Sequence, residues 1–175
     1  LEDLLNGLLL YSGNDNAVAI ADHIAGSTEK FAEMMNAEAK KLMATNSHFV
    51  NPSGLHDDNH YTTAYDLYLI FNECIKHDDF VKIINSSSYT AHITGADGTK
   101  RDVKWEPTNY YAKGEATPPD NVTIIGGKTG TTKGAGNCLI LLTKDSSGNP
   151  YISIIMGAGS KPLLYQDMTS MLSKI

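Results

Sequence analysis

The sequence predicts an α+β fold in which helices come first and a meandering antiparallel sheet, closed by a C-terminal helix, follows. Apolar residues recur at helical spacing through much of residues 1–87, whereas after Ser88 short β-prone runs alternate with turn residues. The 175 residues suit one domain of ordinary size and leave no room for two full cores. We therefore expect one unit over residues 1–175, with a mainly helical region (1–87) and a sheet region (88–175).

The helical region contains five apolar or helix-periodic segments: Leu4–Leu10, Asn16–Ile24, Phe31–Met43, Leu67–Ile75 and Phe80–Ile84. Asp15 is the expected N-cap of the second segment, and Ser27 is the expected N-cap of the third. The turn 51–54 ends the third segment, and a polar loop then leads to Thr63, where the next helix is expected to begin.

The sheet region opens with a hairpin signal, because Asp97-Gly98 lies between the β-prone runs Tyr89–Thr94 and Arg101–Trp105. A Pro-rich loop, Asn109–Asn121, separates the hairpin from three further apolar strands: Val122–Ile125, Cys138–Thr143 and Ile152–Met156. The last two strands should pair antiparallel across the turn 146–149. Helical spacing returns in Leu163–Leu172, which is expected to pack on the sheet.

Composition excludes several classes of function. The formal charge is −6 and the basic residues are scattered, so we expect no nucleic-acid partner. No apolar run approaches the roughly 18 residues of a membrane-spanning helix. Cys74 and Cys138 lack metal-binding spacing and are expected to be free core thiols. The chain opens on Leu1 without a signal segment, and we expect its true beginning to lie elsewhere.

A Lys-Thr-Gly element follows the Val122 strand within the run 126–132. The run is not a Walker phosphate loop, because position 122 is Val and a strand, not a helix, comes after it. Beside an active site, Lys128 and Thr129 offer a cation and a hydroxyl for a carboxylate. Gly130 would let a substrate backbone approach closely.

A second element, Ser12-Gly13-Asn14, fits the pattern S-x-N and precedes Lys128 by 128 − 12 = 116 positions. A serine hydroxyl at such a junction between helices can relay a proton to a leaving group. An asparagine amide can hold a catalytic lysine and bind a substrate carbonyl. Either tripeptide alone is also an ordinary turn or strand sequence.

Together these motifs resemble the serine D-alanyl-D-alanine carboxypeptidases, the low-molecular-mass penicillin-binding proteins. The run 8–27, the helix pattern 31–43, the link elements 48–55 and 60–67 and the Lys-Thr-Gly strand all resemble family segments. The resemblance covers nearly the whole chain and is weakest between Asn85 and Asn121. It implies a β-lactamase/transpeptidase-like fold whose first strands and nucleophile helix are not in this sequence.

The resemblance implies acyl-enzyme chemistry on peptidoglycan stem peptides ending in D-Ala-D-Ala, with β-lactams as substrate mimics. Ser12 would relay protons, Asn14 would order the site, and Lys128 with Thr129 and Gly130 would hold the terminal carboxylate. Thr131 falls where the family uses a backbone N–H for the oxyanion, although many members carry His there. The family implies no cofactor and no metal, work outside the cytoplasmic membrane, and a membrane anchor outside this chain.

The family's nucleophile element, S-x-x-K, is expected upstream of S-x-N, where only eleven residues precede Ser12. The only S-x-x-K in the chain is Ser27-Thr-Glu-Lys30, in the wrong order, and Ser27 is better explained as a helix cap. We therefore expect the nucleophile to be absent and this chain alone to be inert. We also expect an exposed sheet edge where the family's first strands belong, covered by a neighbouring chain.

Three other interpretations remain open at this stage. A β-lactamase would carry Asp rather than Gly13 in S-x-N, and no segment marks its deacylating Glu. A non-catalytic cell-wall-binding module would keep the carboxylate clamp, which consists of Lys128, Thr129 and Gly130, and would bind D-Ala-D-Ala without releasing D-Ala. The pair His56 and His60 has metal-ligand residue types, but the intervening Asp-Asp-Asn predicts a loop rather than a helix. Tyr110 and Tyr111 are expected to pack over the hairpin.

Overall fold

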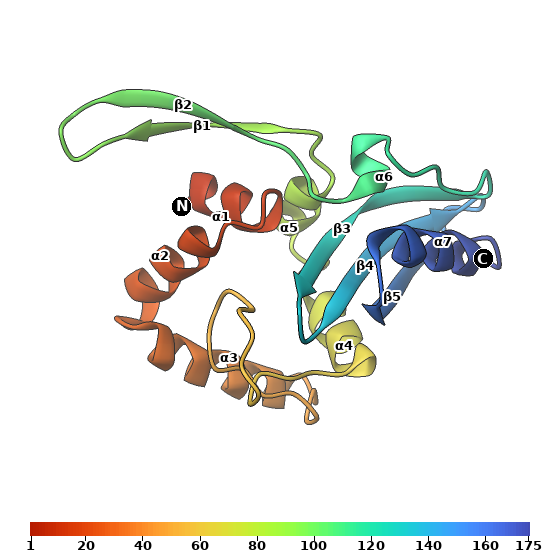
Figure 1. The fold of residues 1–175 in the computed structure, drawn as a ribbon, viewed down its shortest axis with the longest axis horizontal. Coiled ribbons are helices and arrows are strands. Elements are labelled where there is room, and N and C mark those ends of the chain that lie inside the picture. The colour runs from red at the N-terminus through yellow and green to blue at the C-terminus, as the bar shows by residue number, and fades with distance from the viewer.

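The computed structural model describes all 175 residues and has the predicted α+β architecture (Figure 1). The helices are α1 (Glu2–Leu9), α2 (Asn14–Ala25), α3 (Thr28–Lys41), α4 (Ala64–Cys74), α5 (Asp78–Ile84), α6 (Tyr110–Lys113) and α7 (Lys161–Leu172). The strands are β1 (Tyr89–Thr94), β2 (Lys100–Trp105), β3 (Val122–Thr132), β4 (Gly136–Asp145) and β5 (Pro150–Ala158). None of the helices has the length and apolar character needed to span a membrane.

The helix starts are partly as predicted. Ser27 caps α3, because its Oγ accepts a hydrogen bond from the Lys30 backbone N–H (3.2 Å), and Thr63 caps α4 in the same way. The expectation for α2 was wrong: its N-cap is Gly13, and Asp15 lies within the first turn. The Asn16 side chain occupies the space against Gly13 and Gly7, so the helix begins where a residue without Cβ is required.

The link between α3 and α4 is a loop tied down by buried polar contacts. The carboxylate of Asp66 is buried, and its Oδ2 accepts hydrogen bonds from the Asn46 backbone N–H and the Ser47 hydroxyl, both at 2.7 Å. Asn36 pairs through both side-chain atoms with the backbone of Phe49 (2.7 and 2.8 Å). His56 and His60 lie in this loop, as the Asp-Asp-Asn spacing predicted.

The hairpin β1–β2 forms as predicted around Asp97 and Gly98, whose φ of +81° requires a residue tolerant of the left-handed region. It projects from the body above α1 and α2 (Figure 1). At its base Tyr89 stacks on Trp105, with ring centroids 6.1 Å apart, and Trp105 packs on the buried Leu10. The hairpin is thereby anchored to the turn that follows α1.

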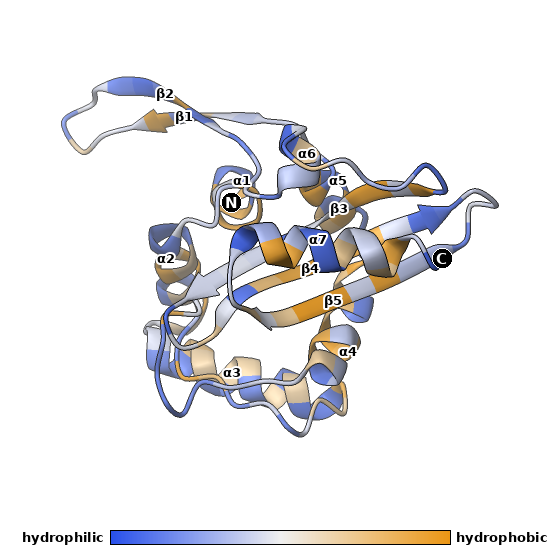
Figure 2. Ribbon diagram, turned by 45° about the vertical axis from the view of Figure 1, so that its right-hand side comes forward, coloured by the Kyte–Doolittle hydropathy of each residue, from blue (hydrophilic) through white to orange (hydrophobic).

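The main sheet has the strand order β3-β4-β5 and is antiparallel throughout, so the predicted pairing of the last two strands is confirmed. α7 packs on one face, as predicted, where Leu139, Leu141 and Met168 form the largest buried cluster. Figure 2 shows the apolar residues gathered along these strands next to α7. The outer edges of β3 and β5 both lack a partner strand, and the expectation that the family's first strands belong at one of them stays a prediction.

The opposite face of the sheet is covered by α4 and α5. Leu142 packs there with Phe71 and Ile84, because successive residues of a strand point to opposite faces. Gly126 of β3 lies against the backbone carbonyl of Ile84, and a Cβ at Gly126 would collide with it. This close approach fixes the start of β3 against α5.

Two smaller expectations were wrong. The Pro-rich segment 109–121 contains the short helix α6, which begins because Asn109 Oδ1 accepts a hydrogen bond from the Tyr111 backbone N–H (3.1 Å). Cys74 and Cys138 are free, but both are half-buried rather than core thiols.

Candidate active site

The Ser12-Gly13-Asn14 turn connects α1 to α2 in a conformation that serine rarely adopts. Ser12 has a φ of +67°, in the left-handed region, and this conformation costs about 1–3 kcal/mol unless its surroundings enforce it. The turn is enforced by a hydrogen bond from the Gly13 N–H to the Gly7 carbonyl (3.0 Å) and by Asn16, against which both glycines pack. Strain of this kind concentrates at functional sites.

The Lys-Thr-Gly element lies within β3 and meets this turn. Lys128 Nζ donates a hydrogen bond to Ser12 Oγ (2.6 Å) and another to the Thr129 carbonyl (2.8 Å). Two elements 116 positions apart in the sequence therefore share one hydrogen bond. Lys128 is half-buried and makes no salt bridge, and desolvation lowers the pKa of its ammonium group to about 8.

A pocket of about 210 Å³ lies beside this contact, between β3, the start of α7 and the segment before α6. It is lined by Ser12, Thr108, Tyr110, Thr129, Gly130, Thr131, Cys138, Lys161, Leu164 and Tyr165. This lining contains hydroxyl groups and an ammonium group but no carboxylate. Such a surface suits a small anionic group, because hydrogen bonds to an ionised acceptor are stronger than neutral ones.

Several lining residues were not expected from the sequence. Thr108 Oγ1 lies 2.6 Å from Thr129 Oγ1, so the two hydroxyls are hydrogen-bonded. Lys161, the first residue of α7, lies 5.7 Å from the ring centroid of Tyr110 and has no carboxylate partner. Only the Ser160 cap, which marks the helix start, could have pointed to Lys161, and nothing in the sequence places α7 beside β3.

The aromatic pair before the pocket does not pack over the hairpin, contrary to expectation. Tyr110 stacks on Tyr165 of α7, with ring centroids 4.5 Å apart, and the Tyr110 backbone N–H donates to the Tyr165 hydroxyl (2.9 Å). Tyr111 is buried against the same Tyr165 ring. Both rings therefore belong to the apolar cluster that α7 forms on the face of the sheet.

The other residues that the sequence singled out do not form a single group in the structure. Asn14 is exposed at the start of α2 and makes no side-chain hydrogen bond. Thr131 is exposed, and its hydroxyl donates to Asn137 Oδ1 (3.4 Å). Ser27 and Lys30 do not line the pocket. No cluster of three or more metal-ligating side chains exists.

Comparisons with known proteins point to one family. Residues 1–160 match the peptidase family described as D-alanyl-D-alanine carboxypeptidase. The chain is 30% identical over 177 residues to the D-alanyl-D-alanine carboxypeptidase DacF of Bacillus subtilis, covering 98% of this chain and 41% of that protein. It is 34% identical over 162 residues to DacD of Escherichia coli, covering 91% and 38%.

Solved structures give the same result. The crystal structure of a Streptomyces DD-transpeptidase superposes with a TM-score of 0.88 at 30% identity, covering 98% of this chain and 66% of that chain. A D-alanyl-D-alanine carboxypeptidase from Mycobacterium tuberculosis superposes with a TM-score of 0.79 at 27% identity, covering 97% and 61%. The chain thus spans about two fifths of the length of the two curated relatives and about two thirds of the matched crystal chains.

Proposed function

The chain belongs to the D-alanyl-D-alanine carboxypeptidase family, and we propose that its pocket binds the D-Ala-D-Ala end of a peptidoglycan stem peptide and binds β-lactams in the same place. The observation that carries this proposal is the hydrogen bond from Lys128 to Ser12 beside a pocket without carboxylates. A peptidoglycan substrate implies work outside the cytoplasmic membrane of a bacterium.

Each residue has a role that follows from its chemistry. Lys128, Thr129 and Lys161 supply two positive charges and a hydroxyl donor for the terminal carboxylate, with Gly130 leaving room for the peptide backbone. The N–H of Thr131 would stabilise the negative charge on the scissile carbonyl oxygen. Because Ser12 accepts a hydrogen bond from Lys128, its own proton is free for the departing D-Ala nitrogen. Asn14 would bind the substrate from the exposed start of α2.

The full reaction requires a serine nucleophile. Its hydroxyl would attack the penultimate D-Ala carbonyl, the C–N bond to the last D-Ala would break, and D-Ala would leave with the proton that Ser12 relays. Water would then hydrolyse the resulting ester. We assign Ser12 to the proton relay rather than to attack, and the Ser27 hydroxyl lies outside the pocket, where it accepts a backbone hydrogen bond at the start of α3.

The central test compares a carboxylate with an amide. The 175-residue chain is expected to bind acetyl-D-Ala-D-Ala at least about tenfold more tightly than its C-terminal amide, because hydrogen bonds to charged groups contribute about 1.5–3 kcal/mol. Chemical-shift titration measures both dissociation constants and locates the perturbed amides. Equal affinity for the two ligands would show that the pocket does not recognise the terminal carboxylate.

A second expectation concerns covalent chemistry. The 175-residue chain incubated with a fluorescent penicillin is expected to give no labelled band on a denaturing gel, because a clamp and a proton relay cannot form an ester without a nucleophile. The Ser27→Ala variant serves as the matched control. A labelled band that disappears in Ser27→Ala would show that Ser27 is the nucleophile and that the chain is not inert.

A non-catalytic binding module is the second candidate function for the 175 residues taken alone. It is favoured by the pocket lining, which contains no carboxylate and whose only serine, Ser12, is assigned to the proton relay rather than to attack. Such a module would bind the dipeptide without releasing D-Ala, which a D-Ala release assay run beside the titration detects.

A further inference from the structure

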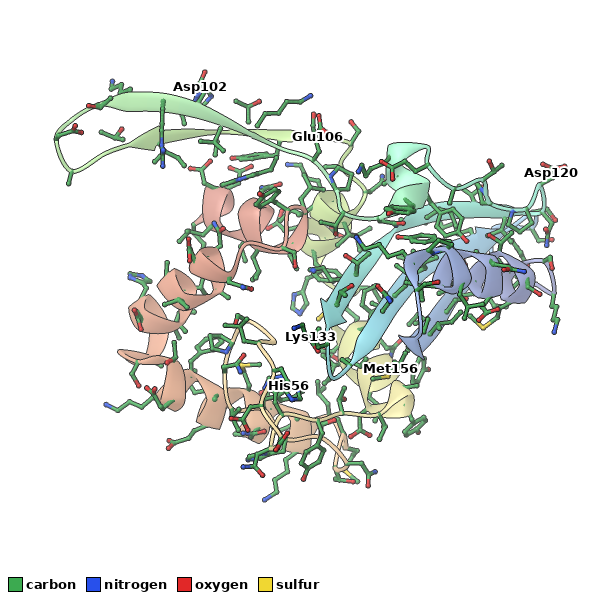
Figure 3. The ribbon with its side chains drawn as sticks, viewed as in Figure 1. His56, Asp102, Glu106, Asp120, Lys133 and Met156 are labelled. Atoms are coloured by element: carbon green, nitrogen blue, oxygen red, sulfur yellow. The ribbon has the colours of Figure 1, made fainter.

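One wall of the pocket carries a hydroxyl group that has no role in the proposed function. This wall is the segment between β2 and α6, which runs from Glu106, directly after the hairpin, to Tyr110 (Figure 3). The segment brings Thr108 beside β3, so that Thr108 and Thr129 both line the pocket. Their hydroxyl oxygens lie 2.6 Å apart, and neither hydroxyl makes another hydrogen bond.

The segment holds Thr108 in a fixed place. The neighbouring residues Pro107 and Asn109 are both buried, and Asn109 caps α6 through its side chain. One residue further on, the Tyr110 N–H donates a hydrogen bond to the Tyr165 hydroxyl of α7 (2.9 Å). Proline restricts the backbone on one side of Thr108, and these hydrogen bonds restrain it on the other. The Thr108 hydroxyl is therefore a fixed part of the pocket wall.

A threonine hydroxyl has a single proton, so the hydrogen bond of this pair can run in two directions. If Thr129 donates to Thr108, Thr129 has no proton left for a ligand. If Thr108 donates to Thr129, the Thr129 proton is free for a carboxylate, and the two hydrogen bonds in series strengthen each other. Lys128 favours the second direction when a carboxylate is bound. Its Nζ donates to the Thr129 carbonyl (2.8 Å), so its charge draws the ligand's negative charge to Thr129.

We propose that Thr108 is a positioning residue of the carboxylate clamp, a role that rests on the proposed function. Thr108 donates its proton to Thr129 Oγ1 and thereby directs the Thr129 proton at the terminal carboxylate, without touching the ligand itself. The clamp on β3 is thus completed by a residue that lies 21 positions earlier in the chain. A ligand with a neutral end gains less from Thr108, because hydrogen bonds to an ionised acceptor are roughly twice as strong as neutral ones.

The first test is Thr108→Val in the 175-residue chain, because valine keeps the shape of threonine and removes its hydroxyl. Chemical-shift titration is expected to show an affinity for acetyl-D-Ala-D-Ala that is roughly 2- to 12-fold lower, the loss of one ordinary hydrogen bond. Affinity for the C-terminal amide should fall less. Thr108→Ser keeps the hydroxyl and should bind the acid within about twofold of the unsubstituted chain. Thr123→Val is the matched control, since Thr123 is exposed on the same strand as Thr129 but outside the pocket, and it should bind both ligands normally.

The second test asks whether Thr108 acts through Thr129. In a chain that already carries Thr129→Val, Thr108→Val should cause no further loss of affinity for the acid, because the hydroxyl that it orients is gone. An equal loss in both backgrounds would mean that Thr108 contacts the ligand directly, and the positioning role would be wrong.

Two other results would also overturn the positioning role while the carboxylate clamp stands. They are an unchanged affinity of Thr108→Val for the acid, and an equal loss for the acid and the amide, as a displaced segment would cause. If Thr108→Val does not fold, Thr108→Ala is held to the same expectations in both backgrounds. If the unsubstituted chain binds the amide as well as the acid, the proposed function itself fails.

Discussion

Lys128→Met is expected to reduce the affinity of the chain for acetyl-D-Ala-D-Ala by roughly 10- to 100-fold, the loss that follows removal of a charged hydrogen-bond donor. Methionine keeps much of the apolar stem but removes the ammonium group that bonds Ser12 at 2.6 Å. The loss combines a missing charge in the clamp with a Ser12 hydroxyl that is no longer oriented. Titration calorimetry or chemical-shift titration measures the change.

Lys144→Met is the matched control, because Lys144 is exposed on the neighbouring strand β4 and makes no salt bridge. Its affinity for the dipeptide should equal that of the unsubstituted chain. A Lys128→Met variant that is folded and binds the dipeptide normally would exclude Lys128 from the clamp.

The lowered pKa of Lys128 makes the same residue visible in pH profiles. Affinity for the carboxylate should fall as the pH rises through and above about 8, since the neutral amine carries no charge for the ligand.

The contribution of Lys128 to the free energy of unfolding should instead increase with pH. The unfolded chain keeps this proton up to the ordinary pKa of 10.5, so unfolding takes up a proton between about pH 8 and 10.5 and the contribution of Lys128 to stability rises across that window. Lys128→Met should lack this rise in denaturation experiments.

Gly126→Ala is expected to destabilise the protein by about 1–3 kcal/mol, the usual cost of inserting a methyl group into a packed contact. The added Cβ would collide with the backbone carbonyl of Ile84, which cannot rotate away as a side-chain end could. Either α5 must move off the sheet or β3 must shift. Because β3 carries Lys128 and Thr129, dipeptide affinity should fall together with stability.

Gly130→Ala provides the comparison within the same strand, since a Cβ there meets no atom within 4 Å. Its unfolding free energy should stay within about 0.5 kcal/mol of the unsubstituted chain. Urea denaturation of the two variants measures the difference, and equal stabilities would mean that the Ile84 contact yields without cost.

Local patterns determined most of the secondary structure. Helical spacing placed α3, α4 and α7, and the turn residues Asp97 and Gly98 placed the hairpin, because these signals act over a few residues. The short helix α6 was missed since its cap, Asn109, lies in a segment that otherwise has the composition of a loop. The start of α2 was misplaced because a single packing partner, Asn16, outweighed the capping preference of Asp15.

Part of the candidate site could likewise be predicted from local sequence and part could not. The tripeptides Ser12-Gly13-Asn14 and Lys128-Thr129-Gly130 were recognisable because they are contiguous motifs of the family. Lys161, Thr108 and Tyr165 carry no motif and enter the pocket only through the packing of α7 and the segment before α6 on β3. His56 reaches Gly134 through a loop whose path depends on the buried carboxylate of Asp66.

The sequence by itself determined the fold class and the family and predicted the Lys128 clamp, because these inferences depend on residues close together along the chain. Only the tertiary structure decided that Lys128 bonds Ser12, that α7 brings Lys161 into the pocket lining, and that His56 rests on Gly134. These contacts join residues that lie far apart in the sequence. They depend on how helices and sheet pack against one another, which no local pattern specifies.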